Sequence, residues 1–156
     1  GAEAVKAEGG TSIRSQVEAI VADGTPFFGH IGMLPQNVHA EGGYRVKGKT
    51  DDEREAIIRD AEALVESGAF AVVLELVAPV VAAQITREIP IPTIGIGSGP
   101  DCDGQILVTT DLWATSPDYI PRHVQPNIHV PLEMRQAVGG WMKSFKTAEV
   151  QSSMGN

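Results

Sequence analysis

The chain has 156 residues, of which 42% are hydrophobic, and carries a formal net charge of −8. This length suffices for one domain with a hydrophobic core but is short of the about 250 residues of a typical α/β barrel. The acidic balance argues against nucleic acid and anionic membrane surfaces as partners, because no basic stripe is present to neutralise phosphates.

The amino-terminal part predicts two strands separated by a helix. Residues 2–8 are rich in apolar side chains and end at two glycines, which is typical of a short strand with a tight exit. Thr11 can cap the following helix, whose apolar positions run i, i+4, i+7 and i+8 from Ile13 and which Gly24 ends. Residues 26–32, with the sequence PFFGHIG, predict the next strand.

The rest of the chain continues this alternation. A glycine-rich loop at 33–49 precedes a helix with Asp51 or Asp52 as its cap and Gly68 at its end. Residues 70–77, FAVVLELV, form the nearly continuous apolar run typical of a parallel strand buried on both faces. The remaining predicted elements are a helix at 80–88 after Pro79, strands at 93–97 and 106–109, and a last helix at about 131–146.

Five strands that alternate with helices predict right-handed βαβ units and a parallel sheet. An open doubly wound sheet and part of a (β/α)₈ barrel both satisfy this pattern. The positions of the polar residues must therefore distinguish the two, because in a barrel the functional side chains gather at the carboxyl ends of the strands.

Lys6 and Glu8 lie two residues apart in the first predicted strand, so their side chains should point to the same face. This spacing places an ammonium and a carboxylate side by side at the carboxyl end of that strand, where an α/β barrel builds its active site. A salt-bridged pair on an exposed sheet edge is the alternative interpretation.

Two further polar residues interrupt apolar strands. Glu75 stands in VVLELV, where a carboxylate is costly unless it is paired, bound to a metal or protonated, and those conditions suit a general acid or base. His30 stands between Gly29 and Gly32, whose small size lets a ligand approach the backbone. A structural buried ion pair at Glu75 and a hydrogen-bonded core histidine at His30 are the alternatives, but three successive strands ending in polar groups favour a common site.

Two loops carry glycines. IGIGSGPDCDG lacks the G-x-G-x-x-G spacing of a dinucleotide site, so we interpret it as a loop that keeps a ligand pocket open, with backbone N–H groups suited to an anion. The loop at 33–49 contains Arg45, Lys47 and Lys49, and is either a solvated flap or a lid over the substrate.

Taken in order, these motifs resemble the ketopantoate hydroxymethyltransferase family. The matching segments are AVKAEGG, GHIGMLPQ, GGYRVKGKT, VVLELV and IPTIGIGSGPDCDGQILV, within about residues 1–112, and the likeness is looser beyond. The resemblance implies a TIM barrel of the phosphoenolpyruvate/pyruvate type, of which this chain holds about strands 4–8. It implies a single partial domain over 1–156, with the strands and crossover helices in 1–112 and a helical segment and tail in 113–156.

The family's reaction is implied in the same way. It transfers a hydroxymethyl group from 5,10-methylenetetrahydrofolate to 3-methyl-2-oxobutanoate (α-ketoisovalerate), giving 2-dehydropantoate for pantothenate and coenzyme A biosynthesis. By the matching motifs, Glu8 is expected to bind Mg²⁺, Lys6 and His30 to bind substrate, and Glu75 to act as the catalytic base. A divalent cation on the keto oxygen and a nearby ammonium would stabilise the enolate that forms.

The family's first three strands have no counterpart in this sequence, so two sheet edges and one side of the core are expected to lie open. We expect a companion N-terminal fragment or closely docked copies, in keeping with the family's homo-oligomers, which are decameric in bacteria. Two alternatives remain. One is another metal-dependent C–C lyase of the superfamily, although the KKCGH-type loop of methylisocitrate-lyase relatives does not occur here. The other is a non-catalytic, incomplete barrel subunit.

Cys102 is the one cysteine, which excludes an intramolecular disulfide and a cysteine-based zinc site and suits a reducing compartment. No apolar run approaches the 18 residues of a membrane span. We therefore expect a cytoplasmic protein that binds a small keto acid and a folate.

Overall fold

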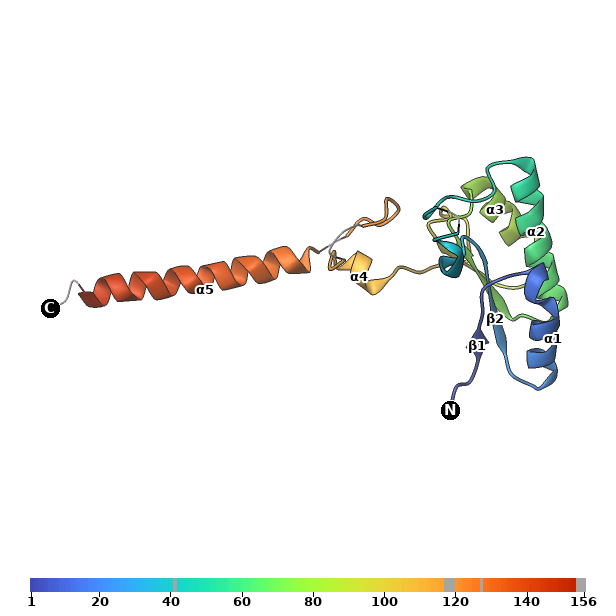
Figure 1. Cartoon of the computed structure of the whole chain (residues 1–156), viewed down its shortest axis with the longest axis horizontal. Helices are drawn as coiled ribbons and strands as arrows, with labels where there is room; N and C mark the ends of the chain where they lie inside the picture. The colour runs from blue at the N-terminus through green and yellow to red at the C-terminus, as the bar shows by residue number, and fades with distance from the viewer. Residues whose placement is uncertain (41, 117–119, 127, 154–156) are drawn as a thin grey trace. The chain divides into compact units, whose positions relative to one another are not determined.

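The computed structural model of the chain describes residues 1–40, 42–116, 120–126 and 128–153 (Figure 1). The chain divides into two compact units, Gly1–Ile106 and Leu107–Asn156. The first unit contains the sheet and its helices, and the second contains the carboxyl-terminal helices. Residues 117–119, before the expected last helix, and residues 154–156 of the expected tail lie outside the described residues.

The first unit is built on a sheet of five parallel strands, which confirms the predicted α/β alternation. The order of the strands in the sheet is their order in the chain, whereas a doubly wound sheet reverses its order at a switch point. This arrangement is compatible with a sector of an α/β barrel. The strands are β1 (Val5–Lys6), β2 (Phe27–Gly32), β3 (Ala71–Glu75), β4 (Thr93–Ile96) and β5 (Gly104–Gln105).

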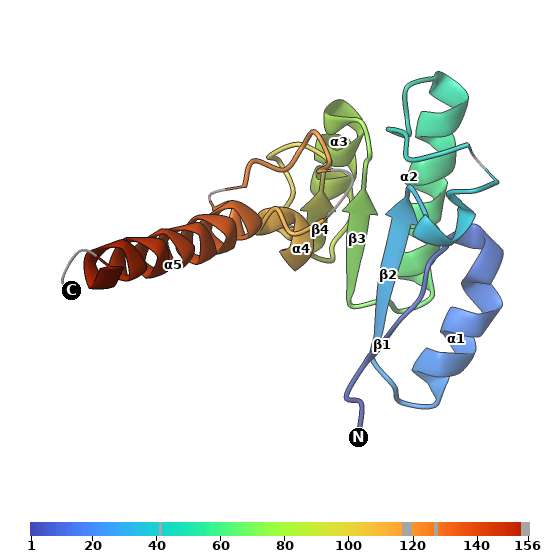
Figure 2. The same ribbon diagram turned by 60° about the vertical axis from the view of Figure 1, so that its left-hand side comes forward.

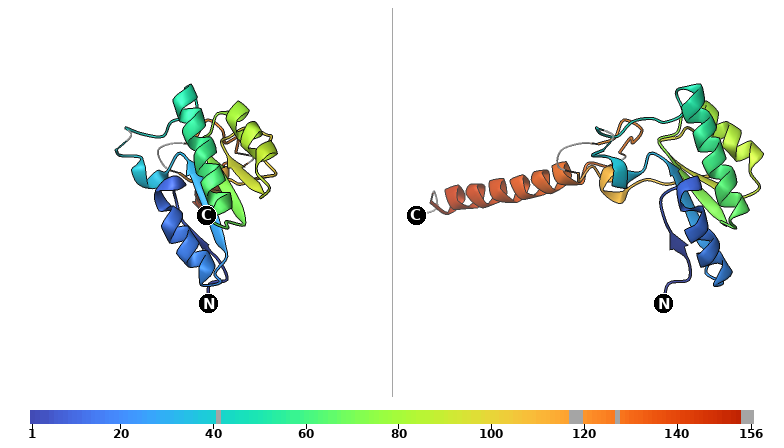
Figure 3. Two further views of the ribbon diagram at one scale, coloured as in Figure 1. Left: turned by 90° about the vertical axis from the view of Figure 1, so that its right-hand side faces the viewer. Right: turned by 45° about the vertical axis from the view of Figure 1, so that its right-hand side comes forward.

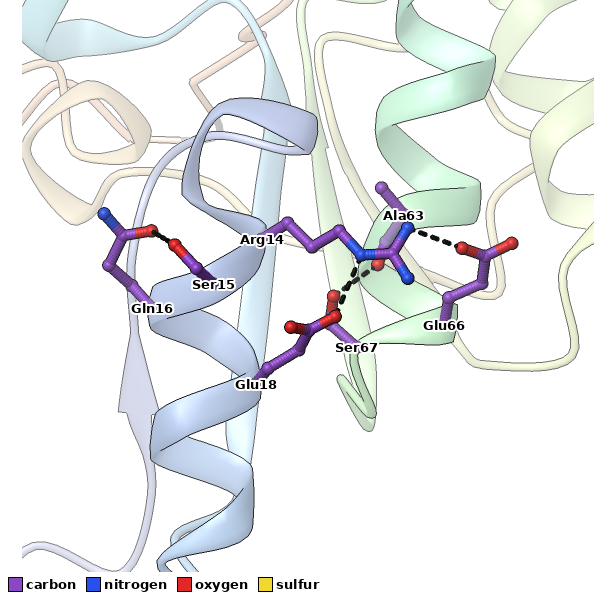
Figure 4. A network of polar contacts seen from close by, with 7 residues as sticks. All are labelled: Arg14, Ser15, Gln16, Glu18, Ala63, Glu66 and Ser67. Atoms are coloured by element: carbon purple, nitrogen blue, oxygen red, sulfur yellow. Dashed lines mark hydrogen bonds and ion pairs between the residues drawn. The ribbon is translucent and has the colours of Figure 1, made fainter.

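Three helices lie along one face of this sheet (Figures 2 and 3). Figure 4 shows how Arg14 links the first helix of the chain to the second. Its guanidinium lies 2.8 Å from Glu66 of the second helix and 2.9 Å from Glu18 of its own helix. These side chains are about half exposed, so the pairs contribute little to stability. The helices are α1 (Arg14–Ala22), α2 (Asp51–Glu66) and α3 (Pro79–Glu88), with short 3₁₀ turns at η1 (Thr11–Ile13) and η2 (Pro35–Asn37).

The core lies between the helices and one face of the strands. Val72 and Leu74 of β3 are fully buried in it and pack with Leu64 of α2. Successive side chains of a strand point to opposite faces, so the alternate residues of each strand lie on the other side. By this alternation and the strand register, this "opposite face" includes Lys6, Phe28, His30, Val73, Glu75, Ile94 and Ile96.

The beginning of the chain differs from expectation in two respects. The first strand spans only Val5–Lys6 instead of residues 2–8. Thr11 does not cap the first helix: the residue before α1 is Ile13, which makes no side-chain cap. Instead the Thr11 hydroxyl donates to Asp60 Oδ1 at 2.7 Å, and the Thr11 backbone N–H donates to the same oxygen at 2.8 Å. The Asp60 carboxylate of α2 thus binds the Thr11 hydroxyl that was expected to cap the helix after Thr11.

Two other boundaries also moved. The cap of α2 is Thr50, whose hydroxyl accepts from the Glu53 N–H at 3.2 Å, while both predicted aspartates lie in the first turn. The last strand is Gly104–Gln105, so the strand predicted at 106–109 is wrong. Its partner β4 ends at Ile96, and beyond β5 the Ile106 N–H still donates to the Gly95 carbonyl at 3.0 Å.

The described part of the second unit includes two helices and the non-helical segments around them. It contains the short helix α4 (Thr109–Leu112) and the long helix α5 (Val130–Ser153), which starts one residue before the predicted position and runs further. Within the described residues, no helix is long and apolar enough to cross a membrane.

Candidate active site

The carboxyl ends of β1, β2 and β3 bring three of the four predicted site residues together. The Gly9 N–H donates to the His30 carbonyl at 2.9 Å, which places Glu8 beside the His30 ring. Glu75 is the last residue of β3 and lies on the same face of the sheet as His30. Lys6 also belongs to this face but is exposed, and Glu8 lies beyond the end of its strand in a bend. The spacing of Lys6 and Glu8 predicted two neighbours on one strand, but only Lys6 lies in the strand.

The His30 imidazole is buried between two carboxylates. Its Nε2 lies 3.1 Å from Glu75 Oε2, and its Nδ1 lies 3.9 Å from Glu8 Oε1. The histidine side chain is 3% exposed, that of Glu75 15% and that of Glu8 23%. Access to the cluster therefore comes from the glutamate side.

The two ring nitrogens of His30 have spare hydrogen-bonding capacity. Both are buried, and neither makes a hydrogen bond of acceptable geometry, in spite of the short distance to Glu75. A buried polar atom without a partner is costly, and such atoms call for a functional explanation. The cluster can therefore bind a polar substrate group, which a fully satisfied core histidine could not do.

The glycines beside His30 serve packing rather than ligand access. A Cβ at Gly29 would lie 2.5 Å from Leu64 Cδ1, on the helix side of the sheet. A Cβ at Gly32 would lie 2.3 Å from the Glu75 carbonyl oxygen, and its φ of 97° is one that other residues rarely adopt. Gly29 therefore lets α2 pack closely on β2. Gly32 lets the chain leave β2 in close contact with the Glu75 backbone.

The chain takes an unusual conformation immediately after Glu75. Leu76 has a φ of 48°, in the left-handed region that disfavours side chains. Its N–H donates to the Ile96 carbonyl at 2.9 Å, and its carbonyl accepts from the Lys47 N–H at 2.8 Å. The Glu75 carbonyl accepts from the Met33 N–H at 2.8 Å. Three neighbouring segments thus fix the backbone on which the Glu75 side chain depends.

The basic loop is pinned at its carboxyl end. Lys47 forms a parallel bridge with Val77, and the Ala78 N–H donates to the Lys47 carbonyl at 2.8 Å. The Lys49 N–H donates to the Glu53 carboxylate at 3.1 Å, and this bond holds the pKa of Glu53 below its ordinary value. Burial opposes the shift less strongly than the bond causes it, and the Arg45 charge lowers the pKa a little further. This end of the loop is therefore attached to the strand that presents Glu75, and is not a free flap.

Sequence reasoning missed Ser98, which is almost fully buried next to the Glu75 turn. The serine stands within the glycine-rich segment IGIGSGPDCDG, and its hydroxyl was the available signal. The same loop is closed by internal bonds. The Asp103 carboxylate accepts from the Thr93 N–H at 2.8 Å, and the Gln105 side chain donates to the Gly99 carbonyl at 3.0 Å.

The described residues contain no group of three or more His, Cys, Asp or Glu side chains that could hold a metal ion. Glu8 still fits the role of a single ligand, because one of its oxygens accepts only a long 3.4 Å bond from the Gln36 N–H and the side chain is partly exposed. Mg²⁺ commonly takes one or two carboxylates and completes its shell with waters and substrate oxygens.

Fold and site together define an α/β protein whose polar residues gather at the carboxyl ends of parallel strands, the position typical of enzymes of this class. A family model for ketopantoate hydroxymethyltransferase matches residues 1–151. The chain belongs to that family.

Three relatives are named 3-methyl-2-oxobutanoate hydroxymethyltransferase. That of Geotalea uraniireducens is 46% identical over 146 residues, covering 94% of this chain and 55% of the relative. That of Anaplasma marginale (strain Florida) is 44% identical over 149 residues, covering 96% and 53%. That of Thermotoga maritima is 54% identical over 122 residues, covering 78% and 45%. The chain thus spans about half the length of the curated relatives it matches.

Proposed function

We propose that this chain supplies half of the active site of a 3-methyl-2-oxobutanoate hydroxymethyltransferase. The reaction transfers a hydroxymethyl group from 5,10-methylenetetrahydrofolate to 3-methyl-2-oxobutanoate and gives 2-dehydropantoate, in pantothenate biosynthesis in the cytoplasm. The observation that carries this proposal is the buried His30 ring, which lies 3.1 Å from the Glu75 carboxylate and faces Glu8 with its other nitrogen.

We propose further that the sheet is a sector of a (β/α)₈ barrel of the phosphoenolpyruvate/pyruvate type. Five parallel strands in chain order, with helices along one face, support this architecture. In a closed barrel the opposite face of the sheet would line the interior, and the carboxyl ends of the strands would form the mouth. A homo-oligomer or a companion chain would cover the two edges.

In this reaction Glu75 accepts the proton on C3 of the keto acid. The electron pair of the C3–H bond forms the C2–C3 double bond of an enolate, and negative charge develops on the keto oxygen. Lys6 lies on the same face of the sheet and offers an ammonium to the keto-acid oxygens. Water adds to the methylene carbon of the folate, the two C–N bonds of that carbon break, and tetrahydrofolate leaves with the water protons on its two nitrogens. The nucleophilic C3 bonds to the released one-carbon unit at the aldehyde level, and the oxygen that came from water takes the proton held by Glu75 to become the hydroxyl of the product.

His30 and Glu8 prepare the site for this proton transfer. The imidazole restricts the Glu75 carboxylate to one side of the strand end, and its own burial excludes water from that side. Glu8 would be one carboxylate ligand of Mg²⁺. When bound, a divalent cation would supply Lewis-acid polarisation of the keto oxygen.

The test is to complete the chain. We define the "completed chain" as this chain combined, by fusion or co-expression, with the segment of the Geotalea uraniireducens relative that it does not cover. With Mg²⁺, the folate and the keto acid, the completed chain is expected to form 2-dehydropantoate, and the added segment by itself to form none. Failure of a folded completed chain to make product would instead support a non-catalytic assembly subunit.

A further inference from the structure

Ser98 bridges the backbone on both sides of Glu75. Its Oγ accepts from the Val77 N–H at 3.0 Å and donates to the Leu74 carbonyl at 2.6 Å. Leu74 precedes the glutamate by one residue and Val77 follows it by two. A single hydroxyl from the loop after β4 therefore spans the stretch of β3 that carries the proposed base.

This stretch needs such a support because the strand ladder stops there. The register of β3 with β4 ends at the pair Glu75 and Ile96, and Leu76 then takes its left-handed φ of 48°. Backbone in a disfavoured conformation persists only where its surroundings over-determine it. The Val77 N–H lies beyond the last ladder pair and bonds to Ser98 instead.

The surroundings leave no substitute for the hydroxyl. Ser98 is 1% exposed, and Leu74 and Val77 are fully buried, so water cannot replace the bonds without a rearrangement. Removing the hydroxyl leaves a buried N–H and a buried carbonyl with one partner fewer, which favours a shift of the turn. A shift of the turn moves the Glu75 side chain relative to His30.

We propose that Ser98 is a positioning residue for Glu75, whose hydroxyl holds the left-handed turn at Leu76 and thereby directs the glutamate carboxylate toward the His30 ring. This role rests on the proposed function of Glu75 as the base that removes the C3 proton. Ser98 touches neither the substrate nor the proton in this proposal, and acts through the backbone from Leu74 to Val77.

A matched pair of substitutions tests the proposal in the completed chain. Ser98→Ala is compared with Ser67→Ala, because Ser67 is also buried and its hydroxyl donates to a carbonyl, that of Ala63 at 2.7 Å, at the far end of α2 (Figure 4). The exchange of the substrate's C3 proton is measured in deuterated water. Ser98→Ala is expected to lower the rate at saturating keto acid by roughly 10- to 100-fold with KM changed little, since small misplacements of a catalytic group cost rate rather than affinity. Ser67→Ala should leave both near the unsubstituted values.

The Glu75→Gln background separates positioning from general destabilisation. If the serine acts through Glu75, adding Ser98→Ala to Glu75→Gln lowers the residual exchange no further. A serine that only stabilises the fold would lower it by the same factor in both backgrounds, and that result would overturn the proposal.

A second readout needs no substrate. In the 156-residue chain, hydrogen–deuterium exchange of the Val77 amide is expected to be roughly tenfold faster with Ser98→Ala and unchanged with Ser67→Ala. Equal protection of this amide in the two variants refutes the role of Ser98 whatever the activity. Absence of C3-proton exchange by the unsubstituted completed chain would refute the proposed function instead, so the two failures are distinguishable.

Discussion

Glu75→Gln separates catalysis from structure at a single side chain. The substitution keeps the shape of the residue and removes its ability to accept a proton. Glu75 is only 15% exposed and lies on the Nε2 side of the buried His30 ring, whereas the other carboxylate paired with this ring among the described residues, Glu8, lies on the Nδ1 side. Neighbouring carboxylates therefore offer no simple replacement for the lost base.

The expected size of the effect follows from the role. A positioned general base contributes about 10²–10⁴-fold, which corresponds to about 2.7–5.4 kcal/mol of transition-state stabilisation. Binding of 3-methyl-2-oxobutanoate should persist, because it depends on Lys6 and the metal rather than on the base. Glu66→Gln is the control, since that carboxylate is 60% exposed and pairs with Arg14 on the helix side of the sheet.

The assay is the exchange of the C3 proton by the completed chain with Mg²⁺ and without folate, which isolates enolisation from carbon transfer. Keto-acid binding is measured in parallel by calorimetry. Exchange at the unsubstituted rate would refute the reasoning and move the base elsewhere, to His30 or a bound water. A variant that does not fold would show instead that the contact of Glu75 with His30 is a structural ion pair.

Three further predictions concern metal, pH and assembly. In the completed chain, Glu8→Gln should strongly weaken Mg²⁺-dependent binding of the keto acid. Glu3→Gln should not, because Glu3 is an exposed residue before β1. Equal effects of the two substitutions in titration calorimetry would contradict the ligand role of Glu8. The depressed pKa of Glu53 contributes stability that is present above the ordinary value of 4.5 and is lost as pH falls through the lower folded value. In urea melts, the stability of the unsubstituted chain relative to Glu53→Gln should therefore shrink on acidification. A difference that stays constant with pH would refute this assignment. The open sheet edges should make the 156-residue chain associate, either with itself or with the added segment, and a well-dispersed 16.5 kDa monomer in light scattering would show that the edges need no cover.

The sequence predicted the strands that carry a strong local signal. The run FAVVLELV identified β3 and made Glu75 conspicuous, because a single carboxylate among apolar neighbours needs a partner. The partner could not be deduced. His30 is 45 positions away in the chain, and only the register of β2 against β3 brings the two together.

The parts that were missed depend on contacts between distant segments. Thr11 has the chemistry of a cap, but its hydroxyl bonds to Asp60, 49 residues further on. Ser98 bonds to backbone groups 21 and 24 residues earlier, so its role could not be deduced from a segment interpreted as a loop around a ligand pocket. The apolar pattern likewise could not predict the position of β5, because the extent of β5 depends on where its partner β4 ends.

The position of bound 3-methyl-2-oxobutanoate tests the central claim most directly. In a crystal structure of the completed chain with Mg²⁺ and the keto acid, a carboxylate oxygen of Glu75 is predicted to lie about 3–3.5 Å from C3, the separation of a near-attack geometry. The keto acid should also lie over the carboxyl ends of β1, β2 and β3, beside His30. A keto acid bound with C3 turned away from Glu75, or with that carboxylate fully engaged by His30 and shielded from the substrate, would contradict the account.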